Sequence, residues 1–232
     1  MRMQPTSELP VLTPLNNWQE KLSLGDEKEA IIQRGDIILL TGENIDDITD
    51  VFASVVTWVT RSIYYHAIVY DHDWNFIHAF ATEVFRDNIK TFFLKKTNVT
   101  LTWLRPKHLD NSAVTEEETK KVVEFATEQL GKPYDLIANA AFLLRADGLP
   151  GVPPLIYKAF QNRNWLHDKR KWHCSELAGA SWYNTCGVQF VVDMKSKTYL
   201  SPADIYDSIY QDVVCTLKVV NGDFQLLTKQ PD

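Results

Sequence analysis

Short apolar runs separated by turn residues predict strands in the first half of the chain. Residues 37–40 (Ile-Ile-Leu-Leu) form one such run before Gly42, and its length and β-branched content favour a buried strand. Residues 64–70 and 76–80 flank a polar turn, which predicts a β-hairpin. Three further segments continue an antiparallel strand pattern: 84–93, 99–104 and 213–227.

Helical spacing and capping residues dominate the second half. Thr115 and Glu118 form a capping box that predicts a helix running to about Leu130, where Gly131 ends it. Apolar spacing after Cys174 predicts a second helix. Four other segments favour helices: 44–60, 136–144, 155–165, and a short one opened by Ser201 and Pro202.

The organisation is that of one folded domain. A chain of 232 residues suits a single domain, which we place at 31–232, preceded by a polar, proline-interrupted N-terminal extension at 1–30. The net charge of -6 and the lack of a dense basic run argue against a nucleic-acid partner. No apolar run of about 18 residues predicts a transmembrane segment, and no signal peptide is recognised.

Three cysteines cannot all pair within one chain, and none forms a CxxC motif. Neither a disulfide framework nor a zinc site is therefore expected, and a reducing, cytoplasmic location is the simplest interpretation. Cys174 is the candidate nucleophile, because a helix N-terminus stabilises a thiolate and can hold an oxyanion. The alternative is a small buried hydrophobic residue. Ser175, beside the thiol, is a candidate for substrate binding.

Two histidines in the predicted hairpin can serve a cysteine nucleophile. His66 lies in an otherwise apolar strand, as either a hydrogen-bonded core residue or a general base. His78 lies in the adjacent strand and can orient such a base, with Glu83 as its rival. Two or three histidines together with Asp71 also suggest a metal site, but their spacing along the chain matches no recognised zinc-binding pattern.

The segment from Gly131 to Asp135 has two interpretations. It is either a helix end followed by a turn, or part of a cleft. In the second case Tyr134 donates its hydroxyl to an oxyanion or a substrate amide. Asp135 then binds a substrate amine, or it simply caps the following helix.

In their order along the chain, these segments resemble the NlpC-type papain-like cysteine peptidases, specifically the permuted YiiX/YebB-like branch. The matching pieces are 35–38 (Gly-Asp-Ile-Ile), 66–69 (His-Ala-Ile-Val), 78–84, 131–135 (Gly-Lys-Pro-Tyr-Asp), 173–177 (His-Cys-Ser-Glu-Leu) and 201–204 (Ser-Pro-Ala-Asp). The resemblance implies an α+β fold, with an antiparallel sheet or half-barrel packed against the cysteine helix. It also implies a catalytic Cys174 and His66, and it puts the polar third position at His78, where many permuted relatives carry glutamate.

The same resemblance implies hydrolysis of an amide through a thioacyl-enzyme, without a metal or organic cofactor. The family's usual substrates are cell-wall peptides or γ-glutamyl linkages, so a small peptide or acyl-amide is the expected partner. Some permuted relatives act instead on lipid acyl groups, which makes a thiol acyltransferase or lipase the first alternative. A non-catalytic binding module of the same fold is the second. The sequence leaves the oligomeric state open.

Overall fold

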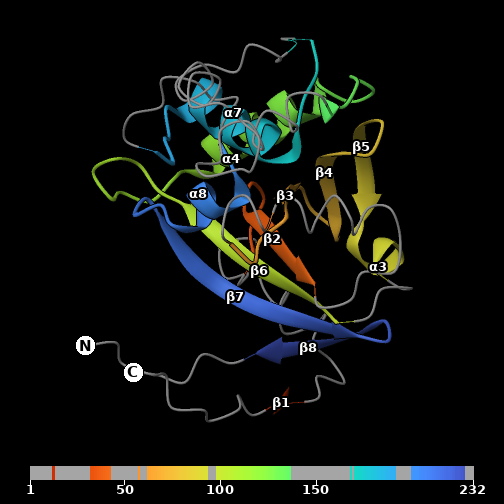
Figure 1. The fold of residues 1–232 in the computed structure, drawn as a ribbon. Helices are drawn as coiled ribbons and strands as arrows, with labels where there is room; N and C mark the ends of the chain where they lie inside the picture. The colour runs from red at the N-terminus through yellow and green to blue at the C-terminus, as the bar shows by residue number, and fades with distance from the viewer. Residues whose placement is uncertain are drawn as a thin grey trace, which may run out of the picture.

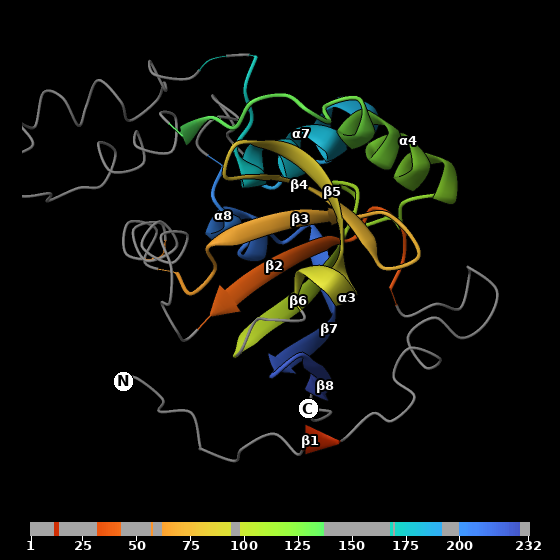
Figure 2. The same cartoon turned by 90° about the vertical axis from the view of Figure 1, so that its right-hand side faces the viewer.

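The computed structural model describes residues 12–13, 32–42, 57, 62–93, 98–136, 168, 170–191 and 200–227. These residues form an α+β fold in which most helices cover one face of an antiparallel sheet and a short helix at 89–92 packs on the other (Figures 1 and 2). Among the described residues, no helix is both long and apolar enough to span a membrane.

Eight strands of the described chain form the sheet, in the order β1-β8-β7-β6-β2-β3-β4-β5. Their bounds are β1 (Leu12–Thr13), β2 (Ile37–Gly42), β3 (His66–Tyr70), β4 (Asn75–Phe80), β5 (Glu83–Asn88), β6 (Val99–Pro106), β7 (Gln211–Val220) and β8 (Asp223–Leu227). The strand predictions for 37–40, 64–70, 76–80, 99–104 and 213–227 are confirmed, with β2 extending to Gly42, β3 starting at His66 and the last segment forming the two strands β7 and β8. β1 pairs with β8, so one described piece of segment 1–30 extends the sheet; the domain boundary at residue 31 stays a prediction.

The described helices are α3 (Ile89–Phe92), α4 (Glu116–Thr127), α7 (Cys174–Cys186) and α8 (Pro202–Tyr206). α4 and α7 pack on each other and against β3 and β4 (Figure 2). The capping boxes at Thr115 and Ser201 are both present. α7 begins at Cys174 as expected, and Gly187 ends it in the left-handed conformation.

Two predicted element ends differ from the structure by more than two residues. The strand predicted over 84–93 stops at Asn88, whose side chain accepts a hydrogen bond from the Lys90 N–H and so starts the short helix α3. The helix expected to reach Leu130 ends at Thr127. The helices predicted at 44–60, 136–144 and 155–165 lie almost entirely outside the described residues.

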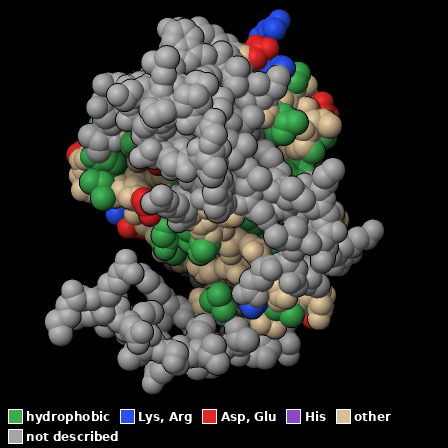
Figure 3. Space-filling model, viewed as in Figure 1, with side chains coloured by type: hydrophobic (Ala, Val, Ile, Leu, Met, Phe, Trp, Pro, Cys, Tyr) green, Lys and Arg blue, Asp and Glu red, His purple; other side chains and the backbone are tan. Residues whose placement is uncertain are grey.

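The two faces of the sheet bury two separate apolar clusters. Alternate strand residues such as Leu39 and Val69 face α4 and α7, where Trp182 is fully buried. Their neighbours, such as Ile68, point to the other face and pack around Phe76. On the surface drawn in Figure 3, described hydrophobic side chains show only in separate groups. Most of the large apolar side chains are thus used in holding helices and sheet together.

The Gly35-Asp36 dipeptide before β2 has a structural explanation. Gly35 has φ +85°, and a Cβ there would lie 3.2 Å from both Thr119 and the Trp182 ring. The Trp182 indole N–H donates to the Gly35 carbonyl at 3.1 Å. Asp36 accepts two hydrogen bonds of 2.9 Å from Arg105, and burial raises its pKa to about 6. This pair ties β2 to β6.

Candidate active site

The site begins where β3 and β4 separate. Their ladder pairs Val69 with Ile77 and Tyr70 with Phe76. Nearer the start of β3, the Ala67 amide lies close enough to the sulfur of Cys174 to lower the pKa of the thiol. The N-terminus of α7 is therefore held against the end of the hairpin at which these strands part.

His66 and His78 meet across this opening. Nε2 of His66 lies 2.9 Å from Nδ1 of His78, although the two residues are 12 positions apart in the chain. His66 is the first residue of β3, and its ring points to the sheet face on which Ile68 and Phe76 are buried. The hairpin predicted from the sequence thus brings both candidate histidines together.

Aromatic rings enclose the histidine pair. His78 is fully buried and stacks on Phe80 with ring centroids 5.4 Å apart, while Phe76 and Phe92 meet it edge-on at 4.8 and 5.2 Å. Burial lowers the pKa of His66 well below its usual value, and the neighbouring His78 lowers it further. Burial also lowers the pKa of His78. Both rings are therefore neutral at pH 7.

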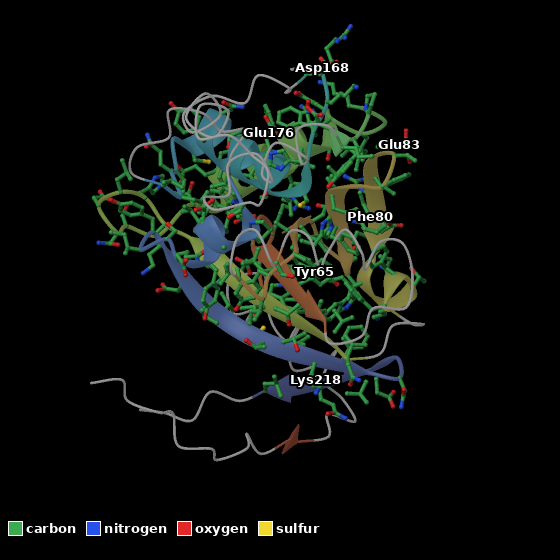
Figure 4. The ribbon with its side chains drawn as sticks, in the orientation of Figure 1. Tyr65, Phe80, Glu83, Asp168, Glu176 and Lys218 are labelled. Atoms are coloured by element: carbon green, nitrogen blue, oxygen red, sulfur yellow. The ribbon has the colours of Figure 1, made fainter. Side chains whose placement is uncertain are left out.

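Cys174 occupies the first position of α7. His173 caps the helix, because its Nδ1 accepts a hydrogen bond from the Glu176 N–H at 3.3 Å. Nε2 of His173 lies 3.7 Å from the buried Glu176 carboxylate (labelled in Figure 4). The cap and its acidic partner fix the helix start, and with it the position of the thiol.

The thiol is buried, with 5% of Cys174 exposed. Burial raises its pKa, while hydrogen bonds from Ala67 and Ser175 act in the opposite direction. Among the described residues, no hydrogen bond joins this thiol to His66; the sulfur lies against the amide of the next residue instead. The structure thus brings the predicted nucleophile to the backbone beside the predicted base, with both groups neutral.

Asp87 is a site residue that the sequence analysis missed. Its Oδ2 lies 3.0 Å from Nε2 of His78. Glu83, the predicted rival of His78, is half-buried at the start of β5, opposite Phe80 near the β4–β5 turn (Figure 4). Strand alternation puts residues 83, 85 and 87 on one face, so the sequence already contained a signal for Asp87. Because His78 pairs with Phe85, Glu83 and Asp87 are both diagonal neighbours of His78, and the contact with Nε2 is what distinguishes Asp87.

The segment 131–135 lies between β5 and the approach to α7. Tyr134 donates its N–H to the Thr82 carbonyl and forms a parallel bridge with Trp172. Asp135 donates its N–H to the Trp172 carbonyl, and its buried carboxylate accepts the Asp168 N–H at 3.0 Å. These contacts anchor the chain just ahead of the thiol, so the Asp135 side chain serves the backbone rather than an open surface.

Ser175 is also used within the fold. Its hydroxyl donates to the Leu200 carbonyl at 2.6 Å, and 1% of the residue is exposed. Together with Gly179, where a Cβ would lie 2.2 Å from the Leu200 side chain, this contact fixes α7 against the segment leading to α8.

The described residues contain no group of three or more His, Cys, Asp or Glu side chains arranged to hold a metal ion. Asp71, the acid considered for such a site, is buried and contacts two arginines and a histidine. Arg86 lies 3.2 Å from it, Arg34 3.5 Å, and Nδ1 of His72 2.6 Å. This cluster ties the β3–β4 turn to the neighbouring strand.

Comparison with known proteins gives little beyond the architecture. No family model matches the chain, and no curated protein matches it. Among solved structures, the crystal structure of metalloprotein yiiX from Escherichia coli O157:H7 aligns over 78% of this chain and 94% of its own, with 15% identity and a TM-score of 0.47. A similarity of this size supports no statement about activity. What is shown for this chain is an α+β protein with an antiparallel sheet packed against helices.

Proposed function

We propose that the chain is a cysteine hydrolase of permuted papain-like type that cleaves an amide bond through a thioacyl-enzyme. The observation that carries the proposal is the contact between Nε2 of His66 and Nδ1 of His78, beside the helix that presents Cys174. Nε2 of His66 faces His78, so the proposed mechanism uses Nδ1 of His66 to exchange a proton with the thiol. Catalytic contacts in unliganded enzymes are often loose and tighten when substrate binds.

The two pKa shifts favour a neutral resting pair, because burial lowers the pKa of His66 and raises that of Cys174. In the proposed reaction His66 takes the thiol proton while the sulfur bonds to the substrate carbonyl carbon. The Cys174 backbone N–H and the Tyr134 hydroxyl stabilise the oxyanion. The C–N bond then breaks, and His66 returns the proton to the leaving amine.

The second half of the reaction restores the enzyme. His66 removes a proton from water as its oxygen attacks the thioester carbon, and the C–S bond breaks to release the acid. The sulfur takes the proton back from His66. Cell-wall-type peptides and γ-glutamyl amides are the substrates we propose first.

One observation favours the non-catalytic alternative. A 5% exposed cysteine whose pKa is raised by burial has less thiolate than a free thiol. A binding module of the same fold would show this property without any turnover, so the experiment must detect the covalent intermediate itself.

The test is mass spectrometry of the intact protein after incubation with p-nitrophenyl acetate, a γ-glutamyl p-nitroanilide or a phospholipid. We expect an acyl group on Cys174 that is lost in Cys174→Ala and kept in Cys186→Ala, a control in the same helix. Acylation by the phospholipid alone would replace amide hydrolysis with lipid acyl transfer. No adduct on Cys174 from any donor would favour the binding module.

A further inference from the structure

We propose that Asp87 is a positioning residue that fixes which ring nitrogens of His78 and His66 carry protons. The importance of this for catalysis rests on the proposed function, but the proton positions do not. Three features carry the inference: the register of β4 and β5, the surroundings of His78, and the direction in which each group can donate.

The register puts Asp87 within reach of His78. His78 pairs with Phe85, so Asp87, two residues further along β5, lies on the same sheet face at the diagonal position. Its Oδ2 is 3.0 Å from Nε2 of His78. The carboxylate is 40% exposed while the ring is fully buried, so Asp87 connects the enclosed histidine pair to solvent.

Both ring nitrogens of His78 have polar partners, and the rest of the ring packs against aromatic side chains. Nδ1 faces His66, Nε2 faces Asp87, and phenyl rings from β4, β5 and α3 surround the remainder: Phe76, Phe80, Phe85 and Phe92. The protons of this ring are therefore decided by two polar contacts, one on each nitrogen.

The order of donation follows from chemistry. An ionised carboxylate only accepts hydrogen bonds, so Nε2 of His78 must donate to Asp87. A neutral imidazole carries one proton, so Nδ1 of His78 must accept. Nε2 of His66 is then the donor, and Nδ1 of His66 is left with a lone pair. This is the form that can accept the proton of Cys174.

Without the negative charge of Asp87, the direction of hydrogen-bond donation from His66 through His78 to residue 87 is no longer fixed. In Asp87→Asn the amide can donate to Nε2 of His78, and the pair then also takes the opposite arrangement, with a proton on Nδ1 of His66. That form has no lone pair for the thiol. In the serine triad the same acid-to-amide exchange stabilises the wrong histidine tautomer.

The test combines ¹⁵N NMR of the histidine rings with the rate of Cys174 acylation by p-nitrophenyl acetate in the full chain. Asp87→Asn keeps the size of the side chain but adds a donor, and Asp87→Ala removes the acceptor without adding a donor. Asp73→Asn is the control, since Asp73 is an 85% exposed aspartate in the β3–β4 turn with positive φ, which asparagine tolerates.

We expect wild type and Asp73→Asn to show His66 with its proton on Nε2 alone. Both Asp87 variants should show a mixture with the Nδ1 form and about 10–100-fold slower acylation. An unchanged His66 spectrum in both Asp87 variants overturns the proposal, as does a changed spectrum with an unchanged rate. If wild type is not acylated, the proposed function fails, while the spectra still decide whether Asp87 sets the protons.

Discussion

The sheet buries two polar pairs, Asp36 with Arg105 and His66 with His78, that differ in charge and in how many of their polar atoms form hydrogen bonds. Asp36 and Arg105 join β2 to β6 through two hydrogen bonds of opposite charges. His66 and His78 join β3 to β4 through one contact between neutral rings. In the first pair every carboxylate oxygen is engaged by a cation, whereas in the second the described residues give a hydrogen-bond partner to only one ring nitrogen of His66. Burial alone therefore does not distinguish a structural polar pair from a candidate site.

The largest effect should come from His66→Gln, which removes the proposed base. We expect acylation of Cys174 to fall about 10²–10⁴-fold with the fold retained, because general-base catalysis contributes on that scale. His72→Gln, half-exposed in the turn of the same hairpin, is the matched control and should keep the wild-type rate. Equal rates in both variants would contradict the assignment of His66.

Arg105→Met tests the charged pair through stability. It leaves Asp36 buried without its cation, so the free energy of unfolding in urea should fall by about 3–5 kcal/mol at pH 7. Because the pKa of Asp36 is raised to about 6, the loss should shrink at pH 5, where this carboxyl is protonated. A loss independent of pH would mean that packing, not charge, is what Arg105 supplies. Acylation per folded molecule should stay unchanged.

Acidification should weaken the fold through the histidine pair. A histidine whose folded pKa is lowered stabilises the protein above its unfolded value of 6.5, and this contribution is lost as the pH falls, because only the unfolded chain takes up the proton. Each histidine adds at most about 1.4 kcal/mol per pH unit. Urea unfolding from pH 7 to 5 should therefore show a shallower loss in His78→Asn than in wild type. Parallel curves would refute a neutral His78.

The smallest effect is expected from Gly35→Ala, which perturbs packing beside the charged pair without altering any charge. The positive φ and the 3.2 Å approaches to Thr119 and Trp182 should cost about 1–2 kcal/mol of unfolding free energy. Thermal unfolding would measure it. A neutral substitution would show that this turn relaxes, and that Gly35 is not needed for the contact with α7.

Much of the framework could be predicted from local chemistry. The strands at 37–42 and 66–70, the capping box at Thr115 and a helix starting at Cys174 were all recognisable, because periodicity and capping act within a few residues. The hairpin also predicted that His66 and His78 share one region. The strand end at Asn88 was missed, since an asparagine cap was read as a continuing strand.

The tertiary structure decided the rest. Sequence alternation and register make Glu83 and Asp87 both diagonal neighbours of His78, and only the three-dimensional arrangement of their side chains makes Asp87 the partner of His78. The position of the thiol near the Ala67 amide likewise depends on how α7 packs on β3. Strand register, the ends of ladders and the burial that shifts pKa values depend on segments distant in the chain. Local sequence pattern could identify the candidate site residues, but only the assembled sheet fixes their neighbours and charge states.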